Sequence, residues 1–340
     1  MYFFIIKRYI KKNILNIIYY YNVIMFYNTK LIILLTNFLL SNSKIAFLSV
    51  GDWGGASLGG YHYKNAEDTS NAMLTFQGQY DAEFVINTGD NFYYCGIENL
   101  TDPLISSDFT DIFGKINIPW YSSLGNHDYG FKPEIQLQLN YVIPNWILEN
   151  RYYMKRLVFN DTIINLIVLD TSPCVSDYRS NDRSKWNPCG LEFPTCGPDK
   201  GVCAFHDNII SQNCTEQLNW FNNTINNISQ NEWIIVVGHH RADQITVEDF
   251  NSILESNKIH LYINGHVHAL QHYKLNDQSK YITTGAGSMV FINEKLNMFS
   301  NDIWKHQDTG FTLHVINDTE LETYFINKNG KIIYNFKINI

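Results

Sequence analysis

Seven short apolar runs constrain the fold of this chain more than any other feature of the sequence. Each run has the length of a β-strand, and several carry apolar side chains at consecutive positions rather than at alternate ones. That pattern is typical of strands that are buried on both faces. The runs occupy residues 45–50, 83–88, 119–124, 163–170, 232–237, 259–264 and 280–286.

Helical patterns fall between these runs. Apolar residues recur at helical spacing in segments 218–228 and 247–254. Segment 64–78 is a further candidate helix. Thr246 is the expected N-cap of the last of these helices. Buried strands that alternate with helices predict a layered α/β domain. Segment 311–340 predicts antiparallel strands, with a turn at Asn329-Gly330.

Side chains that can bind a metal ion follow five of the runs, each directly after a glycine. The glycine lets the backbone turn sharply at the end of the strand. Because chemistry in α/β sheets sits beyond the carboxyl ends of the strands, we expect these side chains to lie together. They are Asp52, Asp90 (with Tyr93 three residues later), Asn126, His239, and the pair His266 and His268.

Each motif alone has a plainer explanation, such as a turn aspartate, a turn asparagine or a structural histidine. Their joint occurrence is harder to explain by folding, because clustered carboxylates repel one another and lose hydration on burial. A bound cation removes both objections. Seven donors are more than one catalytic ion would use, and they suit two ions about 3.5–4 Å apart. Asp90 lies in the middle of the set and is the expected bridging ligand.

The segments around these donors resemble the five metal motifs of the purple acid phosphatases, within the calcineurin-like metallophosphoesterases. The motifs read GDWG, GDNFY, GNHD, VGHH and GHVH, and they occur in that order. The longer stretches NIPWYSSLGNHDYG and LYINGHVHALQHY are similar to the small, tartrate-resistant type. The resemblance covers about residues 45–290. It implies an α/β fold in which a two-sheet β-sandwich is flanked by helices, as a single catalytic domain.

The resemblance also implies two metal sites. Most metallophosphoesterases have a histidine in the first motif where this chain has Gly54, and a phenolate from Tyr93 can replace that donor. Phenolate is a hard anion and favours Fe(III) over a divalent ion. Site one, for Fe(III), would take Asp52, Asp90, Tyr93 and His268. Site two, for Fe(II), Zn(II) or Mn(II), would take Asp90, Asn126, His239 and His266.

A proton donor for the leaving alkoxide is expected next to the metal ligands. His127, adjacent to Asn126, is the best candidate, with packing as its alternative role, and Asp128 is expected to orient its imidazole. Mammalian-type members carry a second histidine about nine residues after the ligand of the fourth motif, where this chain has Glu248. Proton donation then rests on His127 alone, or His240 substitutes for the missing histidine; His240 could equally be a surface residue.

The resemblance implies an acid phosphatase that hydrolyses phosphate monoesters by attack of a metal-activated hydroxide at a binuclear Fe(III)–M(II) centre. The alternatives are a nucleotide phosphodiesterase on the same centre and a non-catalytic scaffold of the same fold. Outside residues 1–44 the chain has 19 basic and 33 acidic side chains, a formal charge of −14. This acidic body argues against nucleic-acid polymers as partners, so we expect small phosphomonoesters or phosphoproteins as substrates, and a monomer.

The N-terminal residues 1–44 read as a leader. They hold six Lys or Arg and no acidic residue, and Lys30 precedes the apolar stretch LIILLTNFLL and the polar run SNS. This is the pattern of a signal peptide, with Met25 as an alternative start. An uncleaved anchor is the other explanation, but ten apolar residues fall short of the roughly 20 that span a bilayer. Residues 45–340 would then form the catalytic domain of a secreted, lysosomal or vacuolar protein without a stable membrane span.

Cysteine spacing and glycosylation sequons agree with the secretory pathway. Five of the six cysteines crowd into a segment that predicts a disulfide-stapled loop over 173–214, with connectivity left open. A zinc knuckle is disfavoured because close C-x-x-C pairs are missing. The cysteines are Cys95, Cys174, Cys189, Cys196, Cys203 and Cys214. Sequons for N-glycosylation occur at Asn99, Asn160, Asn213, Asn222, Asn227 and Asn317.

Overall fold

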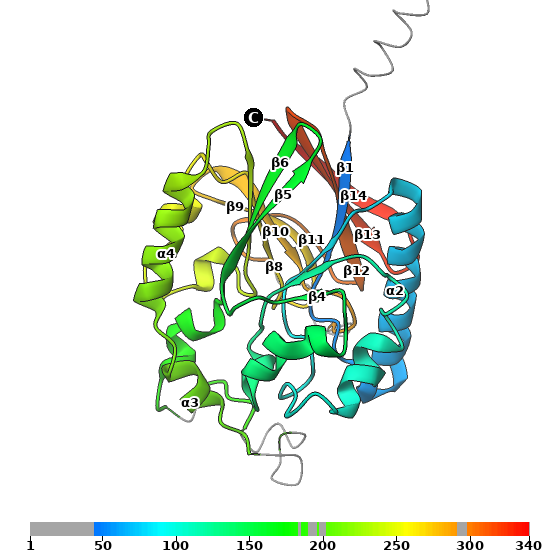
Figure 1. The fold of residues 1–340 in the computed structure, drawn as a ribbon, viewed down its shortest axis with the longest axis vertical. Coiled ribbons are helices and arrows are strands. Elements are labelled where there is room, and N and C mark those ends of the chain that lie inside the picture. The colour runs from blue at the N-terminus through cyan, green and yellow to red at the C-terminus, as the bar shows by residue number, and fades with distance from the viewer. Residues whose placement is uncertain (1–43, 183–184, 190–195, 197–201, 291–297, 340) are drawn as a thin grey trace, which may run out of the picture. The chain divides into compact units, whose positions relative to one another are not determined.

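Two seven-stranded sheets form the body of the chain (Figure 1). The computed structural model describes residues 44–339, apart from 183–184, 190–195, 197–201 and 291–297. The predicted leader therefore lies outside the described residues, except for Lys44. No helix in the described part of the chain is both long enough and apolar enough to cross a membrane.

The first sheet has the strand order β14-β13-β12-β1-β2-β3-β4. Its strands are β1 (Ile45–Val50), β2 (Val85–Asn87), β3 (Trp120–Ser122), β4 (Trp146–Ile147), β12 (Gly310–Ile316), β13 (Glu320–Asn327) and β14 (Ile332–Asn339). The second sheet has the order β11-β9-β10-β8-β7-β6-β5. Its strands are β5 (Tyr153–Phe159), β6 (Thr162–Val168), β7 (Trp233–Val237), β8 (Leu261–Asn264), β9 (Leu270–Leu275), β10 (Gln278–Thr284) and β11 (Asp302–His306).

Each sheet contains four adjacent parallel strands, to which antiparallel strands are added. In the first sheet β1, β2, β3 and β4 are parallel, and β12, β13 and β14 extend the sheet from β1 in antiparallel fashion. In the second sheet β6, β7, β8 and β10 are parallel, and β5, β9 and β11 are antiparallel to their neighbours. The amide of Gly51, after β1, donates to the carbonyl of Thr284, at the end of β10. The carboxyl ends of parallel strands from both sheets therefore meet.

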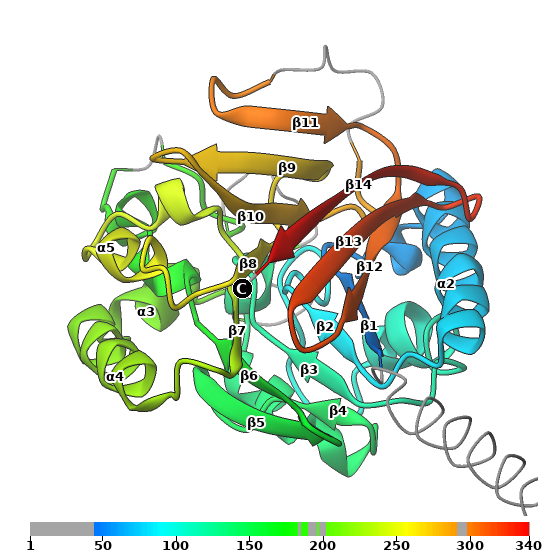
Figure 2. The same ribbon diagram turned by 90° about the horizontal axis from the view of Figure 1, so that it is seen from above.

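The consecutive apolar residues of the central strands fill two separate cores. Along β7, Trp233, Ile235 and Val237 enter the core shared by the two sheets. Ile234 and Val236 face the other way, into a second core with Phe221 and Phe250 from the helices outside the second sheet (Figure 2). Full burial of one such side chain stabilises the fold by roughly 1.5–3 kcal/mol. The two-sheet sandwich flanked by helices is thus confirmed.

The helices are α2 (Gly60–Tyr80), α3 (Phe205–Ile210), α4 (Cys214–Asn227) and α5 (Phe250–Leu254). Three of the helices overlap the predicted segments, whereas α3 lies within the segment 173–214, for which the sequence predicts a loop. Helix α2 contacts the first sheet at β1 and β12. The prediction that Thr246 is the N-cap of α5 is wrong, because the Asp249 side chain accepts a hydrogen bond from the Ser252 amide. The amides of Thr246 and Val247 instead donate to the carbonyl of Cys174 and hold this segment outside the helix.

Four strands lack a matching run in the sequence, namely β4, β5, β9 and β11. Strand β4 has only two residues. Strand β5 lies at a sheet edge and alternates between exposed and partly buried residues, among them Lys155 and Arg156. Edge strands face solvent on one side and need no continuous apolar run. The predicted hairpin turn at Asn329-Gly330 is confirmed, since β13 and β14 flank it and pair antiparallel.

All six cysteines form disulfides, which confirms the disulfide prediction over the zinc knuckle. The pairs are Cys95–Cys196, Cys174–Cys214 and Cys189–Cys203. Cys95 lies two residues after Tyr93, so the first disulfide ties the loop of a candidate ligand to the cysteine-rich segment. Three disulfides fit a protein that matures in an oxidising compartment.

A buried histidine in the first sheet makes the stability of the fold depend on pH. His314 lies on β12, stacks on Phe47 at 4.5 Å between ring centroids, and contacts the hydroxyls of Ser49, Thr312 and Thr323 through its ring nitrogens. Burial lowers the pKa of His314 from its ordinary 6.5 to about 3. The folded state therefore resists a proton that the unfolded chain accepts, and stability falls as the pH drops from 6.5 toward 3.

We expect the stability advantage of the wild type over His314→Gln to shrink by about 1.4 kcal/mol for each pH unit below 6.5. Glutamine keeps hydrogen-bonding groups but does not titrate in this range. Urea unfolding of both proteins at pH 7, 6, 5 and 4 measures the difference. A difference that stays constant over this range would contradict a neutral buried imidazole.

Candidate metal centre

The candidate ligands lie in loops at the carboxyl ends of parallel strands from both sheets. Asp52, Asp90 and Asn126 follow β1, β2 and β3 of the first sheet, and His239 and His266 follow β7 and β8 of the second. The loops bond to one another, since the Asp52 amide donates to the Gly89 carbonyl at 3.0 Å and the Gly265 amide to the His239 carbonyl at 2.9 Å. Side chains that are far apart in the sequence thus share one site.

Four candidate ligands adopt a backbone conformation that side chains rarely tolerate. The φ angle is 54° at Asp52, 53° at Asp90, 71° at His266 and 51° at His268. Left-handed backbone at non-glycine residues costs free energy and persists where the surroundings enforce it, often at functional sites. The sharp turns predicted at the preceding glycines therefore fall partly on the ligands themselves.

Two of the preceding glycines provide space for a neighbouring carboxylate. A Cβ atom at Gly125 would lie 2.1 Å from Oδ1 of Asp90, and a Cβ atom at Gly265 would lie 2.5 Å from Oδ2 of Asp52. Both contacts are far shorter than van der Waals distance, so the carboxylates can approach only a residue without a side chain. The glycine of these motifs is needed for close packing around the site.

The Tyr93 hydroxyl contacts the other three donors expected at site one. The Tyr93 hydroxyl lies 3.1 Å from Oδ1 of Asp52, 3.1 Å from Oδ2 of Asp90 and 3.1 Å from Nε2 of His268. Nε2 of His268 lies 3.2 Å from Oδ1 of Asp52. Two carboxylates, a phenol and an imidazole thus converge on one point.

The donors expected at site two lie beside this cluster. Nε2 of His239 lies 3.0 Å from Oδ1 of Asn126 and 3.3 Å from Oδ2 of Asp90. The His266 ring is 5.2 Å from the His239 ring between centroids. The same oxygen of Asp90 therefore faces both clusters, whereas its Oδ1 accepts from the His127 amide at 2.9 Å.

The spacing and chemistry of the donors fit cations. Ligands at about 2.1 Å from an octahedral ion lie about 3.0 Å from their neighbours, close to the separations seen here. Each carboxylate is also held by a backbone amide, because Oδ2 of Asp52 accepts from the His266 amide at 2.9 Å. One oxygen of Asp52 and one of Asp90 therefore remain directed at the donor clusters.

Electrostatics at the site reflect the buried charges. Burial by itself favours the neutral acid, but His239 and His127 hold the pKa of Asp90 well below its usual range. Burial works against a charge on His239, and the Asp90 carboxylate nevertheless raises its pKa to about 9. Burial and the two carboxylates raise the pKa of the Tyr93 phenol well above its usual range. A phenolate at this position therefore needs a cation beside it.

The predicted proton donor His127 is fixed in position beside the clusters. Its Nδ1 donates to the carbonyl of Tyr94 at 2.7 Å. Its ring lies 4.5 Å from the Tyr93 ring and 5.0 Å from the Trp186 ring between centroids. The carbonyl of Thr88 orients His239 in the same way, at 2.8 Å from Nδ1. Sequence reasoning missed these orienting groups, because a backbone carbonyl is present in every residue and leaves no signal.

Asp128 does not take the orienting role expected for it. Its carboxylate accepts hydrogen bonds from the amides of Asn91, Phe92 and Gly125 and from the Gln136 side chain. Asp128 therefore fixes the backbone of the loop that carries Asp90, and the partner of Nδ1 of His127 is the Tyr94 carbonyl.

His240 lies in the site but is enclosed by protein groups. It is buried, and its ring is 4.4 Å from the His266 ring between centroids. Its Nδ1 contacts the Thr171 hydroxyl at 3.0 Å, and its Nε2 contacts the Tyr178 hydroxyl at 3.1 Å. Both ring nitrogens thus have partners, and the alternative of a surface residue does not hold.

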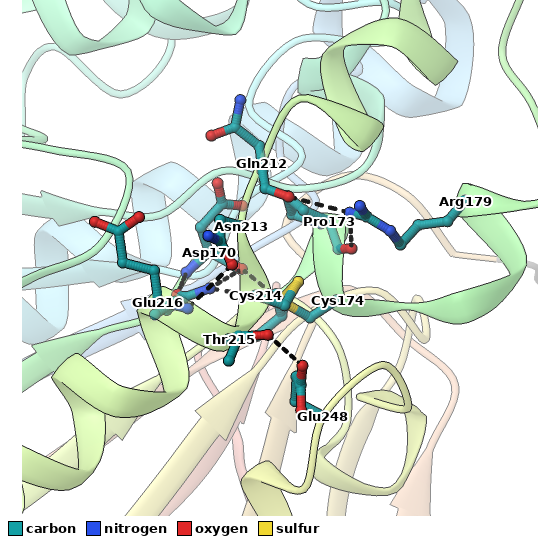
Figure 3. The surroundings of a disulfide bond; sticks show 12 residues. Asp170, Pro173, Cys174, Arg179, Gln212, Asn213, Cys214, Thr215, Glu216 and Glu248 are labelled. Atoms are coloured by element: carbon teal, nitrogen blue, oxygen red, sulfur yellow. Dashed lines mark hydrogen bonds between the residues drawn. A yellow bond between two sulfur atoms is a disulfide. The ribbon is translucent and has the colours of Figure 1, made fainter.

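The Glu248 side chain is not among the side chains of the candidate site. Its carboxylate accepts from the Thr215 hydroxyl, next to the Cys174–Cys214 disulfide (Figure 3). Glu248 therefore does not take the place of the second active-site histidine that the resemblance implied.

Comparison with known proteins agrees with the geometry. The model of the calcineurin-like phosphoesterase family matches residues 45–270. The chain is 29% identical to purple acid phosphatase 3 of Arabidopsis thaliana, over 96% of this chain and 88% of the relative. It is 24% identical to tartrate-resistant acid phosphatase type 5 of Mus musculus, over 88% of this chain and 92% of the relative. The resemblance predicted from the five motifs is confirmed.

Two solved structures share the fold. GAP50, the anchor in the inner membrane complex of Plasmodium, matches with a TM-score of 0.64 and 21% identity, over 87% of this chain and 89% of that chain. The purple acid phosphatase PPD1 from yellow lupin seeds matches with a TM-score of 0.59 and 14% identity, over 88% of this chain and 54% of that chain. At these identities the likeness establishes the fold alone.

We expect iron and zinc ions to raise the melting temperature of the metal-free protein, because they relieve repulsion among the buried donors. An ion at 100 times its dissociation constant adds about 2.7 kcal/mol to the stability. Asp90→Asn should lose most of this gain, whereas Asp277→Asn, an exposed site on the β9–β10 turn, should keep it. Thermal scans with and without ions test this, and equal gains in both variants would contradict it.

Proposed function

Because this chain belongs to the calcineurin-like phosphoesterase family, a family of hydrolases, we propose that it is an acid phosphatase for phosphate monoesters. The observation that carries the proposal is the position of Oδ2 of Asp90, 3.1 Å from the Tyr93 hydroxyl and 3.3 Å from Nε2 of His239. One oxygen between two donor clusters suits a bridging ligand of a two-metal centre.

The donor clusters suggest which residues would hold each ion. Site one would be held by Asp52, Asp90, Tyr93 and His268, and site two by Asp90, Asn126, His239 and His266. The hard phenolate favours Fe(III) at site one, and the neutral imidazoles and amide suit a divalent ion at site two. When bound, the two ions supply Lewis acidity and a water of lowered pKa.

The side chains of this chain would bind the ester and complete the proton transfers. Because Nδ1 of His127 donates to Tyr94, Nε2 is the nitrogen that can pass a proton to the leaving-group oxygen. The Tyr93 and Trp186 rings pack against the imidazole and help to fix its position. Both ring nitrogens of His240 are engaged by Thr171 and Tyr178, so His240 is better suited to support its neighbours than to donate a proton. Proton donation therefore rests on His127.

Two other functions share the fold. A nucleotide phosphodiesterase would use the same donors, and parallel assays with mono- and diesters separate the two activities. A scaffold role, such as that of GAP50 as the anchor in the inner membrane complex of Plasmodium, would not require seven converging donors. The complete donor set in this chain supports catalysis over scaffolding.

Replacing Tyr93 tests the metal assignment directly. We expect the purified wild type to contain iron, to show a visible phenolate-to-iron absorption band and to hydrolyse 4-nitrophenyl phosphate at acidic pH. Tyr93→Phe should lose the band, whereas Tyr141→Phe, at an exposed position, should retain it. A colourless wild type without iron or hydrolysis would refute the proposal, and colour in Tyr93→Phe would refute the phenolate assignment.

Replacing His127 tests the proton donor. We expect His127→Ala to lower kcat for an alkyl phosphate about 10²- to 10⁴-fold. The loss should be much smaller for 4-nitrophenyl phosphate, because its leaving group departs without a proton. Steady-state kinetics on both substrates at one pH makes the comparison, with the second substrate as an internal control. Equal losses would assign His127 to substrate positioning instead.

A further inference from the structure

Asp170 and Thr171 lie at the end of β6 and belong to none of the five motifs. We propose that they are positioning residues for site two, and that they fix the relative position of two of its four candidate ligands, Asn126 from the first sheet and His239 from the second. This inference rests on the proposed function, because it assigns a role toward the metal of that same site.

The Thr171 hydroxyl organises the turn that carries His239. It accepts hydrogen bonds from the amides of His239 and His240, both at 3.1 Å. Its own proton points to Nδ1 of His240 at 3.0 Å. A hydroxyl has one donor and two acceptor sites, so Thr171 uses its full capacity on this single turn.

This pattern also assigns the tautomer of His240. Because its Nδ1 accepts from Thr171, its Nε2 carries the proton and donates to the Tyr178 hydroxyl at 3.1 Å. The His240 ring is thereby fixed against the rings of His239 and His266, with centroids 4.9 and 4.4 Å away. Thr171 therefore supports two candidate ligands, one through the backbone and one through His240.

The Asp170 carboxylate holds the corresponding motif of the first sheet. Its Oδ2 accepts from the Tyr129 hydroxyl and lies 3.6 Å from Nη1 of Arg151. Tyr129 ends the short turn His127–Tyr129 that begins directly after Asn126. Consecutive side chains thus reach the two loops whose ligand atoms, Oδ1 of Asn126 and Nε2 of His239, lie 3.0 Å apart.

The segment that carries Asp170 and Thr171 is itself fixed to helix α4. The Gln217 side chain accepts from the Asp170 amide at 2.7 Å and donates to its carbonyl at 2.9 Å. The Cys174–Cys214 disulfide joins the same segment to the first residue of α4, and Figure 3 shows Asp170 and this disulfide beside the start of the helix. A fixed support of this kind can determine the position of the ligands that it contacts.

The contacts predict an effect on one site only. In the described part of the chain, neither Asp170 nor Thr171 contacts Asp52, Tyr93 or His268, which surround site one. Thr171→Val keeps the shape of the side chain but leaves the amides of His239 and His240 without this acceptor. Loss of such an outer contact lowers metal affinity about 10- to 100-fold.

The test compares divalent-ion binding with the iron chromophore in the intact protein. For Thr171→Val we expect the dissociation constant of zinc at site two to rise about 10- to 100-fold, with iron content and the visible band retained. Thr171→Ser restores the hydroxyl and should bind zinc like the wild type. Thr69→Val is the matched control, because Thr69 is buried in α2 and its hydroxyl has no hydrogen-bond partner among the described residues.

The outcomes separate a failure of this inference from a failure of the proposed function. Wild-type zinc affinity in Thr171→Val, or equal weakening in Thr69→Val, would overturn the inference. Loss of iron together with zinc would also overturn it, because it would indicate general disruption. If Thr171→Val does not fold, Asp170→Asn takes its place, and unchanged zinc affinity there overturns the inference. A wild type that binds neither ion defeats the proposed function instead, so the two failures are distinguishable.

Discussion

The buried carboxylate of Asp90 is the constraint on which the rest of the site depends. One of its oxygens is held by the His127 amide, and the other lies within 3.3 Å of donors from both clusters. A charge in this position is costly unless positive partners surround it. The left-handed backbone of Asp90 and the absence of a side chain at Gly125 are both required to place the carboxylate there. The left-handed backbone at Asp90 and the glycine at position 125 are therefore both linked to the placement of one buried carboxylate.

The imidazoles around this anion are oriented by groups that do not themselves face the site. Backbone carbonyls of Thr88 and Tyr94 accept from His239 and His127, and the Thr171 hydroxyl organises the turn between His239 and His240. Such contacts fix tautomers and ring planes, and they raise the basicity of a ligand. The first sheet supplies most of the hard oxygen donors and the second supplies the imidazoles, so the site exists only because the two sheets pack together. Each proposed site draws donors from both sheets, and the two ions are distinguished by the Tyr93 phenol at site one and the neutral imidazoles and amide at site two.

Much of the fold and of the candidate site could be predicted from the sequence alone. The central strands are recognisable because they are buried on both faces, and the donors are recognisable because each follows such a strand. Edge strands such as β5 are not, because several of their side chains are exposed or only partly buried. Thr246 has a good capping side chain, but its hydroxyl accepts from the Ser176 amide instead of an amide of the helix. Asp128 is next to His127 in the sequence, yet its carboxylate turns toward the backbone of the Asp90 loop.

The sequence by itself determined the fold class, the family and which seven side chains would converge, because these depend on residue type and on position at strand ends. Only the tertiary structure decided the disulfide pairs and the position of the Asp90 oxygen that faces both clusters. It also decided the burial of His240 and the contacts that Asp170 and Thr171 make with the two loops. Those features arise from backbone carbonyls and amides, and from contacts between residues on different sheets. A backbone group is chemically the same at nearly every position, so its role becomes definite only when folding brings a particular side chain within hydrogen-bonding distance.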